Sequence, residues 1–161
     1  MASSDFYLKV KGVEGEAKAK GHDKEIEISS WNWGVSNGSS SQIGSGAGRG
    51  RAVPQDLIVT ANYGKQSANL AQRCAAGAHI EEVKLFARKA GGEQEDYMII
   101  TMGTVFISSV QFSGVQNGDV SESVSMAYKK IKFEYKEQDD KGKLNAGPEF
   151  SWDIEKNEAK N

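Results

Sequence analysis

The chain of 161 residues contains one cysteine, two prolines and two histidines, and it has no long apolar run. A single cysteine, Cys74, excludes an internal disulfide framework. No stretch reaches the roughly 18 consecutive apolar residues of a membrane-spanning helix, so we expect no membrane insertion. The start, MASSDFYLKV, has neither a basic lead nor an apolar core, so we expect no cleaved signal peptide.

An excess of either charge is also missing. The formal net charge is −2, with 26% charged and 38% apolar residues. This balance is typical of a soluble globular chain and disfavours a protein that coats nucleic acid or anionic lipid. The length and the absence of an internal repeat predict a single domain over residues 1–161.

The side chains that carry chemistry lack the spacing that chemistry needs. His22 and His79 belong to no H-x-x-x-H pattern and no C-x-x-C occurs, so we expect no metal and no cofactor. Cys74 has no base beside it in sequence and is predicted to be a packed thiol. Pairs of acids such as Glu81 and Glu82 fall in polar connections, and no G-x-S-x-G is present. The sequence therefore predicts no catalytic residues and a protein that is not an enzyme.

What the chain has in quantity is alternation with period two. In DFYLKVKGV, for example, Phe6, Leu8 and Val10 share one face. Similar short runs end at glycine, asparagine or charge clusters, and 18 glycines suit many tight turns. We therefore expect a mainly β fold. The other alternating runs are KEIEISSWNWG, QDLIVTANY, EEVKLFARK and a last piece with Phe150, Trp152 and Ile154.

Two segments break this pattern. DYMIITMGTVFISSVQF is apolar on both faces, so both faces need covering, one of them by something other than the chain's own core. In VSMAYKKIKFEY the apolar phase changes after Tyr128, which predicts a β-bulge near Tyr128–Lys130 of the kind that bends barrel strands.

One segment predicts a helix. SANLAQRCAAGAH offers Ser67 or Asn69 as a cap, an apolar side made by Leu70 and Cys74, and Gly77 as terminator. The helix should lie against the sheet and close one opening. Residues 156–161 are expected to be a frayed tail.

The segment GSSSQIGSGAGRGR, residues 38–51, resembles a phosphate-binding loop in composition only. Its glycines at 44, 46, 48 and 50 do not give G-x-G-x-x-G, and no G-K-[ST] follows. The GRGR piece leaves open an RNA-binding interpretation, although no aromatic residues are interleaved with it.

Six stretches follow one another along the chain: DFYLKVKGVEGEA, GHDKEIEISSWNWG, QDLIVT, SANLAQRCAAGAHI, VKLFARKAGGEQEDYMIITMGTVFISSV and SESVSMAYKKIKFEY. In this order and spacing they resemble the Hcp family, the haemolysin-coregulated proteins of the type VI secretion system. The resemblance implies a small antiparallel β-barrel with one helix, assembled as a hexameric ring. It further implies rings that stack into a tube inside a contractile sheath, capped by a VgrG-type spike. The tube would be assembled in the bacterial cytoplasm and secreted, with small effector proteins carried and stabilised in its lumen.

The resemblance also implies two functional segments. A long flexible loop at about 36–54 would meet the next ring through Ser41, Gln42, Ile43, Gly44, Gly46, Gly48, Arg49 and Arg51. The turn after ISSV would face the lumen through Ser113, Gly114, Val115, Gln116 and Asn117. Two alternatives remain at this point, a monomeric β-barrel that binds a small ligand and an RNA-binding module.

Overall fold

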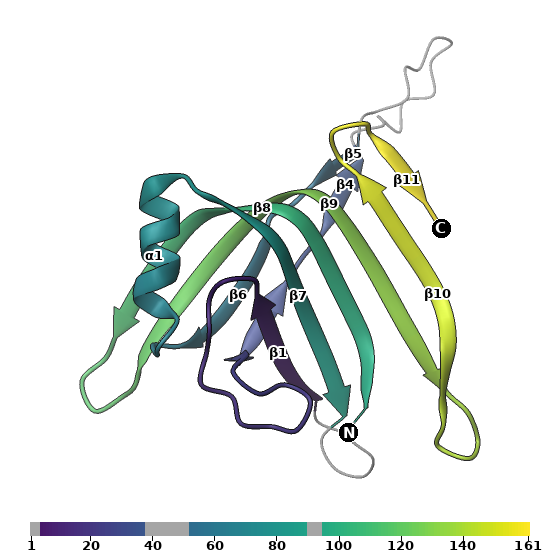
Figure 1. Cartoon of the computed structure of the whole chain (residues 1–161), viewed down its shortest axis with the longest axis horizontal. Helices are drawn as coiled ribbons and strands as arrows, with labels where there is room; N and C mark the ends of the chain where they lie inside the picture. The colour runs from purple at the N-terminus through teal and green to yellow at the C-terminus, as the bar shows by residue number, and fades with distance from the viewer. Residues whose placement is uncertain (1–3, 38–51, 90–94) are drawn as a thin grey trace.

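The computed structural model describes residues 4–37, 52–89 and 95–161 (Figure 1). Over these residues the protein is mainly antiparallel β-structure with one helix, as the alternation predicts. The elements are β1 (Ser4–Val10), β2 (Ile26–Ile28), β3 (Ser30–Asn32), β4 (Val35–Asn37), β5 (Ala52–Pro54), β6 (Leu57–Asn62), α1 (Ser67–Ala76), β7 (His79–Lys89), β8 (Asp96–Gly114), β9 (Val120–Gln138), β10 (Leu144–Asp153) and β11 (Glu158–Lys160).

Nine strands form one curved sheet in the order β11-β10-β9-β8-β7-β1-β2, with β6 joining β9 to β3. The pairings do not run as an uninterrupted barrel, because β1 pairs with β2 whereas β3, the next strand, pairs with β6. Ser29 lies between β2 and β3, and its N–H and Oγ–H both donate to the Thr60 carbonyl at 2.8 Å. The sheet therefore folds back on itself around the core, with one change of partner at Ser29.

The core is made by the inward-facing residues of this sheet. On β6, for instance, Leu57, Val59 and Ala61 are buried while the residues between them are not. Burying a side chain of this kind stabilises the fold by about 1.5–3 kcal/mol for a valine or leucine. Leu8, Leu85, Ile100, Met102 and Met126 are buried from the neighbouring strands, so the apolar alternation read from the sequence is the core pattern.

The predicted β-bulge near Tyr128–Lys130 is wrong, because β8 and β9 keep one register from Met102↔Ile131 to Val105↔Tyr128. All four of these side chains are buried, so both strands turn their side chains over at the same level. Thr104 has a φ of 48° there, a left-handed conformation within a strand. A bend of both strands absorbs the change of phase, and the register shift lies instead between Ile107 and Ser109.

Helix α1 begins and ends by different means. Neither predicted cap is used: the N-cap is Gln66, without a side-chain cap hydrogen bond, while the Ser67 Oγ accepts the Gly64 N–H at 2.9 Å. The predicted terminator is confirmed, because Gly77 has a φ of 64° and its N–H reaches the last carbonyls of the helix. Leu70 is buried and Cys74 packs partly buried against the core, so α1 lies beside β8 (Figure 1).

Two expected irregular segments contain strands. Residues 36–37 and 52–54 of the predicted loop belong to β4 and β5, which pair as a separate two-stranded sheet. The intervening residues 38–51 lie outside the described residues. The expected frayed tail at 156–161 instead includes β11, which pairs with Ser151–Asp153 of β10.

Thr104→Gly tests the bend. A β-branched residue in the left-handed region costs roughly 1–2 kcal/mol, and glycine removes that cost at an entropic loss of about 0.5–1 kcal/mol. We expect the free energy of unfolding, measured by urea denaturation, to rise by about 0.5–1 kcal/mol. The neighbouring core truncation Val105→Ala should lower it by about 1–3 kcal/mol. A Thr104→Gly loss as large as that of Val105→Ala would contradict this account of the bend.

Candidate functional site

One outward face of the sheet carries no charged side chain. The registers β3–β6, β6–β9 and β9–β8 align residues of the same face in two rows four strands wide and one row three strands wide. Alternate residues on these strands point into the core, which leaves hydroxyl and amide side chains and one isoleucine outside. We call this surface the hydroxyl face; it consists of Asn32, Ile58, Ser125 and Ser109, then Ser30, Thr60, Ser123 and Gln111, then Asn62, Ser121 and Ser113.

Members of the hydroxyl face are exposed or half-buried. The opposite face of the same strands holds Val59, Val124 and Met126 in the core, so most apolar and hydroxyl positions are separated; Ile58 on the outer face and buried Glu122 on the inner face are the exceptions. Serine and threonine hydroxyls both donate and accept hydrogen bonds. This face can therefore form hydrogen bonds with peptide groups of a partner and does not select partners by their charge. In a chain with 26% charged residues, eleven neighbouring outward positions without one distinguish this surface from the rest.

The predicted lumen residues lie at the tip of the β8–β9 hairpin. Ser113 and Gly114 end β8, and Val115, Gln116 and Asn117 form the exposed turn. Ser113 belongs to the hydroxyl face, where its Oγ lies 2.9 Å from the Ser121 Oγ. The turn is closed by the Gly118 N–H, which donates to the Val115 carbonyl at 3.1 Å. The predicted ring-stacking residues Ser41, Gln42, Ile43, Gly44, Gly46, Gly48, Arg49 and Arg51 lie outside the described residues.

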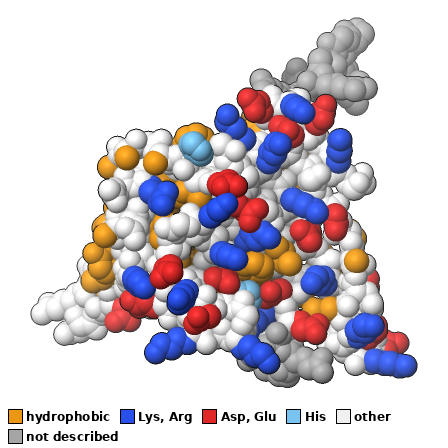
Figure 2. Space-filling model, viewed as in Figure 1, with side chains coloured by type: hydrophobic (Ala, Val, Ile, Leu, Met, Phe, Trp, Pro, Cys, Tyr) orange, Lys and Arg blue, Asp and Glu red, His pale blue; other side chains and the backbone are white. Residues whose placement is uncertain are grey.

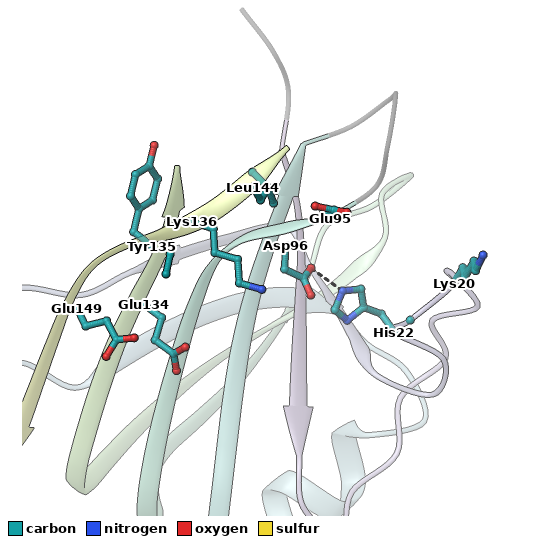
Figure 3. Close-up of a pocket in the computed structure, with 11 residues that line it drawn as sticks. Lys20, His22, Glu95, Asp96, Glu134, Tyr135, Lys136, Leu144 and Glu149 are labelled. Carbon is teal, nitrogen blue, oxygen red and sulfur yellow. Dashed lines mark hydrogen bonds and ion pairs between the residues drawn. The ribbon is translucent and has the colours of Figure 1, made fainter. Parts of the chain in front are cut away.

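A second polar site centres on His22, which is only 3% exposed (Figure 3). Its Nδ1 lies 3.0 Å from the Glu25 carboxylate and its Nε2 lies 2.8 Å from Asp96 at the start of β8. The ring stacks on Tyr7 with centroids 4.5 Å apart. Each of the two ring nitrogens therefore lies within hydrogen-bonding distance of one carboxyl group.

Arg88 completes this cluster from β7. Its guanidinium lies over the Tyr7 ring at 4.9 Å, donates to the Tyr7 hydroxyl at 3.2 Å and donates to the Lys20 carbonyl at 3.0 Å. The loop after β1 is thus fastened to the sheet by side chains from β1, β7 and β8. Burial raises the pKa of the Glu25 carboxyl above its usual value of 4.5, and the hydrogen bond with His22 offsets only part of that effect.

A cavity of about 430 Å³ opens beside His22 and is lined by charged side chains of both signs. Figure 3 shows Glu134 and Glu149 from β9 and β10 on one side, and Lys20 on the other. Among residues 4–37, 52–89 and 95–161, no three His, Cys, Asp or Glu side chains are grouped so as to hold a metal ion. The contacts of His22 are those of a structural anchor, because it joins Glu25 to Asp96, which lies 74 positions from His22 in the sequence.

Sequence reasoning treated His22 as a residue of a charged turn and did not foresee its burial between two carboxylates. Asp96 is too distant in sequence to signal this contact. His79 is exposed at the start of β7, where its ring lies 6.0 Å from that of Phe106. The hydroxyl face did leave a signal, the alternating serines of SESVS, but only the strand registers show that four strands share it.

Charge is unevenly distributed over the surface. Figure 2 shows lysine, arginine and acidic side chains interspersed over the part formed by β7, β9 and β10, with few over α1 and the β8–β9 hairpin. Residues 97–118 contain no charged residue at all. No helix in the described part of the chain is long and apolar enough to cross a membrane.

The architecture is that of a small antiparallel β protein with one helix and an uncharged outward face. Residues 7–135 match the family model described as "Type VI secretion system effector, Hcp". The protein hcp1 of Pseudomonas aeruginosa is 40% identical over 156 residues, which cover 95% of this chain and 96% of that protein.

Solved structures agree with this match. A structure of a type six secretion system protein superposes with a TM-score of 0.92 at 29% identity, covering 98% of this chain and all of the other. Hcp1 from Salmonella typhimurium gives a TM-score of 0.77 at 28% identity, covering 99% of each chain. The chain belongs to the Hcp family of type VI secretion effector and tube proteins, a family of secreted structural proteins.

Glu25→Gln tests the anchor through pH. The folded state raises the pKa of Glu25 and therefore binds the carboxyl proton more tightly than the unfolded state does. The folded protein is stabilised in full by this proton below pH 4.5, the usual pKa of the group. The stabilisation is lost as pH rises through the pKa of the folded state. The variant cannot titrate, so the unfolding free energy of the native chain minus that of Glu25→Gln should fall as pH rises from 4 to about 7. The exposed neighbour Glu27→Gln provides the control. A difference that is flat with pH, or the same for both variants, would exclude this role of Glu25.

Proposed function

We propose that this chain is a non-enzymatic subunit of the type VI secretion tube. Six copies form a ring, rings stack within a contractile sheath, and the tube leaves the cell with a VgrG-type spike. Small effector proteins travel in the lumen, where the ring acts as carrier and chaperone. Assembly takes place in the cytoplasm, and secretion by the type VI system requires no cleaved signal peptide.

The observation that carries this proposal is the hydroxyl face together with the charge-poor hairpin. Cores of protein interfaces are depleted of charged residues, and large exposed apolar groups mark surfaces that other proteins cover. The described surface has such groups on the hairpin, including Phe112 at 45% and Val115 at 74% exposure. Membership of the Hcp family supplies the assembly in which these surfaces would be used.

The lumen assignment extends from the hairpin tip to the strands behind it. Ser113 is continuous with Ser121 and Ser123 on the hydroxyl face, so a contact made at the tip can continue along the sheet. Short uncharged side chains suit a passage that must hold different cargo proteins and release them. Ring stacking stays assigned to the segment Ser41–Arg51, which the paired strands β4 and β5 flank.

The monomeric ligand-binding barrel is less well supported. A small-molecule site is typically concave and mostly apolar. Within the described residues the interior is filled by side chains such as Leu57, Met102 and Met126, each with no exposed surface. The cavity beside His22 lies instead among charged side chains.

The mass of the native protein tests the subunit proposal. Native mass spectrometry should give a particle of six 17.4 kDa chains, and negative-stain electron microscopy should show a ring with a central opening. Apolar groups left exposed by one chain would then be covered by its neighbours. A monomer at high concentration would reject the proposal and favour the ligand-binding barrel.

Ser113→Trp tests the lumen assignment. An indole at this position would project from the hydroxyl face and occupy space that cargo needs, while leaving the core unchanged. We expect co-purification of effector proteins with the ring to fall at least about tenfold, as loss of roughly 1.4 kcal/mol of binding would give, while ring mass is unchanged. Asn145→Trp, at an exposed position of β10, is the control and should leave cargo binding intact. Equal cargo binding by both variants would place the cargo surface elsewhere.

A further inference from the structure

A separate cavity of about 420 Å³ opens on the outer face of strands β8, β9, β10 and β11. We call it the lysine cavity, after the four cationic side chains that line it, Lys130, Lys132, Lys156 and Lys160. Two acids, Asp153 and Glu158, also lie in its wall. The excess of positive charge contrasts with the whole chain, whose formal net charge is −2. The cavity therefore offers a place for an anion.

Strand register brings the donors of the cavity together. One row across the sheet aligns Thr101, Lys132, Ser151 and Lys160, and ends at β11, the edge strand beside β10 (Figure 1). Aligned residues of neighbouring strands point to the same face, so two lysines alternate with two hydroxyl residues. Because neighbouring strands lie about 4.8 Å apart, the backbones of Lys132 and Lys160 are about 10 Å apart, with Ser151 between them. Ammonium and hydroxyl groups of this row can all donate hydrogen bonds to one ligand.

The floor of the cavity has no side chain at Gly103. This glycine lies opposite Lys130 in the neighbouring row, and both residues line the cavity. A Cβ atom added to Gly103 would lie 3.7 Å from the Lys130 Cβ and would meet no other residue beyond its chain neighbours within 4 Å. The space above Gly103 is therefore open, and a ligand can approach the sheet closely there.

The positive charges of the cavity are largely available. Within the described residues neither Lys156 nor Lys160 forms an ion pair. The Lys132 Nζ lies 3.6 Å from the carboxylate of Glu149, which lines the cavity beside His22 rather than this one. Exposed pairs of this kind contribute little to stability, so an anion can compete for the ammonium group.

The two acids of the wall differ in their contacts. Asp153 accepts the backbone N–H of Lys156 at 3.1 Å and lies 3.9 Å from the Lys130 Nζ, so its charge serves the turn between β10 and β11. Glu158 is exposed and lies opposite Asp153 in β11. Glu158 is therefore the acid that would most oppose the binding of an anion.

We propose that the lysine cavity binds a compact ligand that carries two or more phosphate groups. Each phosphate group offers strong acceptor oxygens and more than one negative charge, which suits ammonium and hydroxyl donors along one row. A single carboxylate would leave most of these donors without a partner. A long nucleic acid strand is disfavoured, because the next row on the same face presents Glu134 beside Glu149. The site lies outside the hydroxyl face and adds a small-molecule ligand to the proposed function.

Isothermal titration calorimetry with inorganic triphosphate tests the site on the full chain. We expect one triphosphate to bind per chain. Lys160→Gln removes an unpaired donor near the end of the chain and should weaken binding by about tenfold. Lys18→Gln is the matched control, because it removes the same charge from an exposed position of the loop after β1 and should leave the Kd nearly unchanged. Equal losses in both variants would overturn the proposal, since they would show attraction to net charge alone.

Two further variants test the shape of the cavity and the sign of its charge. Gly103→Val fills the floor without changing any charge and should also weaken binding by about tenfold. Glu158→Gln removes a negative charge from the wall and should strengthen binding by about threefold, whereas the exposed Glu27→Gln should not. An unchanged Kd in both Gly103→Val and Glu158→Gln would place the anion elsewhere. If Gly103→Val does not fold, the result for Glu158→Gln decides alone.

Titrations with other anions identify the class of ligand. Citrate carries several carboxylates and a short single-stranded DNA oligonucleotide carries a row of phosphodiesters. We expect both to bind more weakly than triphosphate. Citrate binding as tight as triphosphate would overturn the assignment to phosphate, and tighter binding of the oligonucleotide would overturn the assignment to a compact ligand. An absence of triphosphate binding would reject the site and leave the subunit proposal, which depends on the native mass, unaffected.

Discussion

The antiparallel pairing of β8 with β9 is the constraint on which the remaining structure depends. Each strand has 19 residues, and β7 attaches to β8 while β6 and β10 attach to β9. The pair bends at Thr104 and keeps its register there, and the register shifts nearer the hairpin tip, between Ile107 and Ser109. The bend divides the pair into two parts: residues near the hairpin tip present hydroxyls outward, and residues beyond Lys129 present lysines and glutamates. A single pair of strands thereby builds an uncharged surface and a charged one.

Polar groups serve different purposes on these two surfaces. His22, Glu25 and Asp96 are held by hydrogen bonds and stacking, and burial makes their contacts costly to break even though buried ion pairs add little net stability. Their effect is to fix the loop after β1 in one position on the sheet. On the hydroxyl face, by contrast, Ser121, Ser123 and Ser125 remain partly exposed. These side chains remain accessible to a partner, although Ser121 already shares a hydrogen bond with Ser113, whereas the His22 cluster is buried within the chain.

Much of the fold can be predicted from the sequence because it depends on residues that are close together along the chain. The period of two places Leu57, Val59 and Ala61 in the core, and Gly77 ends the helix because its φ is positive. Features that depend on a second strand could not be predicted in this way. The phase change at Tyr128 predicts a bulge only if the partner strand keeps its phase, and β8 changes with it. Similarly, the hydroxyl face can be recognised only when the registers of three strand pairs are known. The contact between His22 and Asp96 joins residues 74 positions apart.

The exposed edge of β10 is protected against the addition of another strand. β11 covers β10 only at Ser151–Asp153, which would leave the rest of β10 open to strand addition. That part contains Pro148, which has no N–H to donate, and a register shift between Ala146 and Glu149. Both features are known protections of edge strands, because they interrupt the row of backbone donors and acceptors. The open part of β10 is therefore a poor template for an added strand, and the fold meets the exposed edge of its own sheet without a covering element.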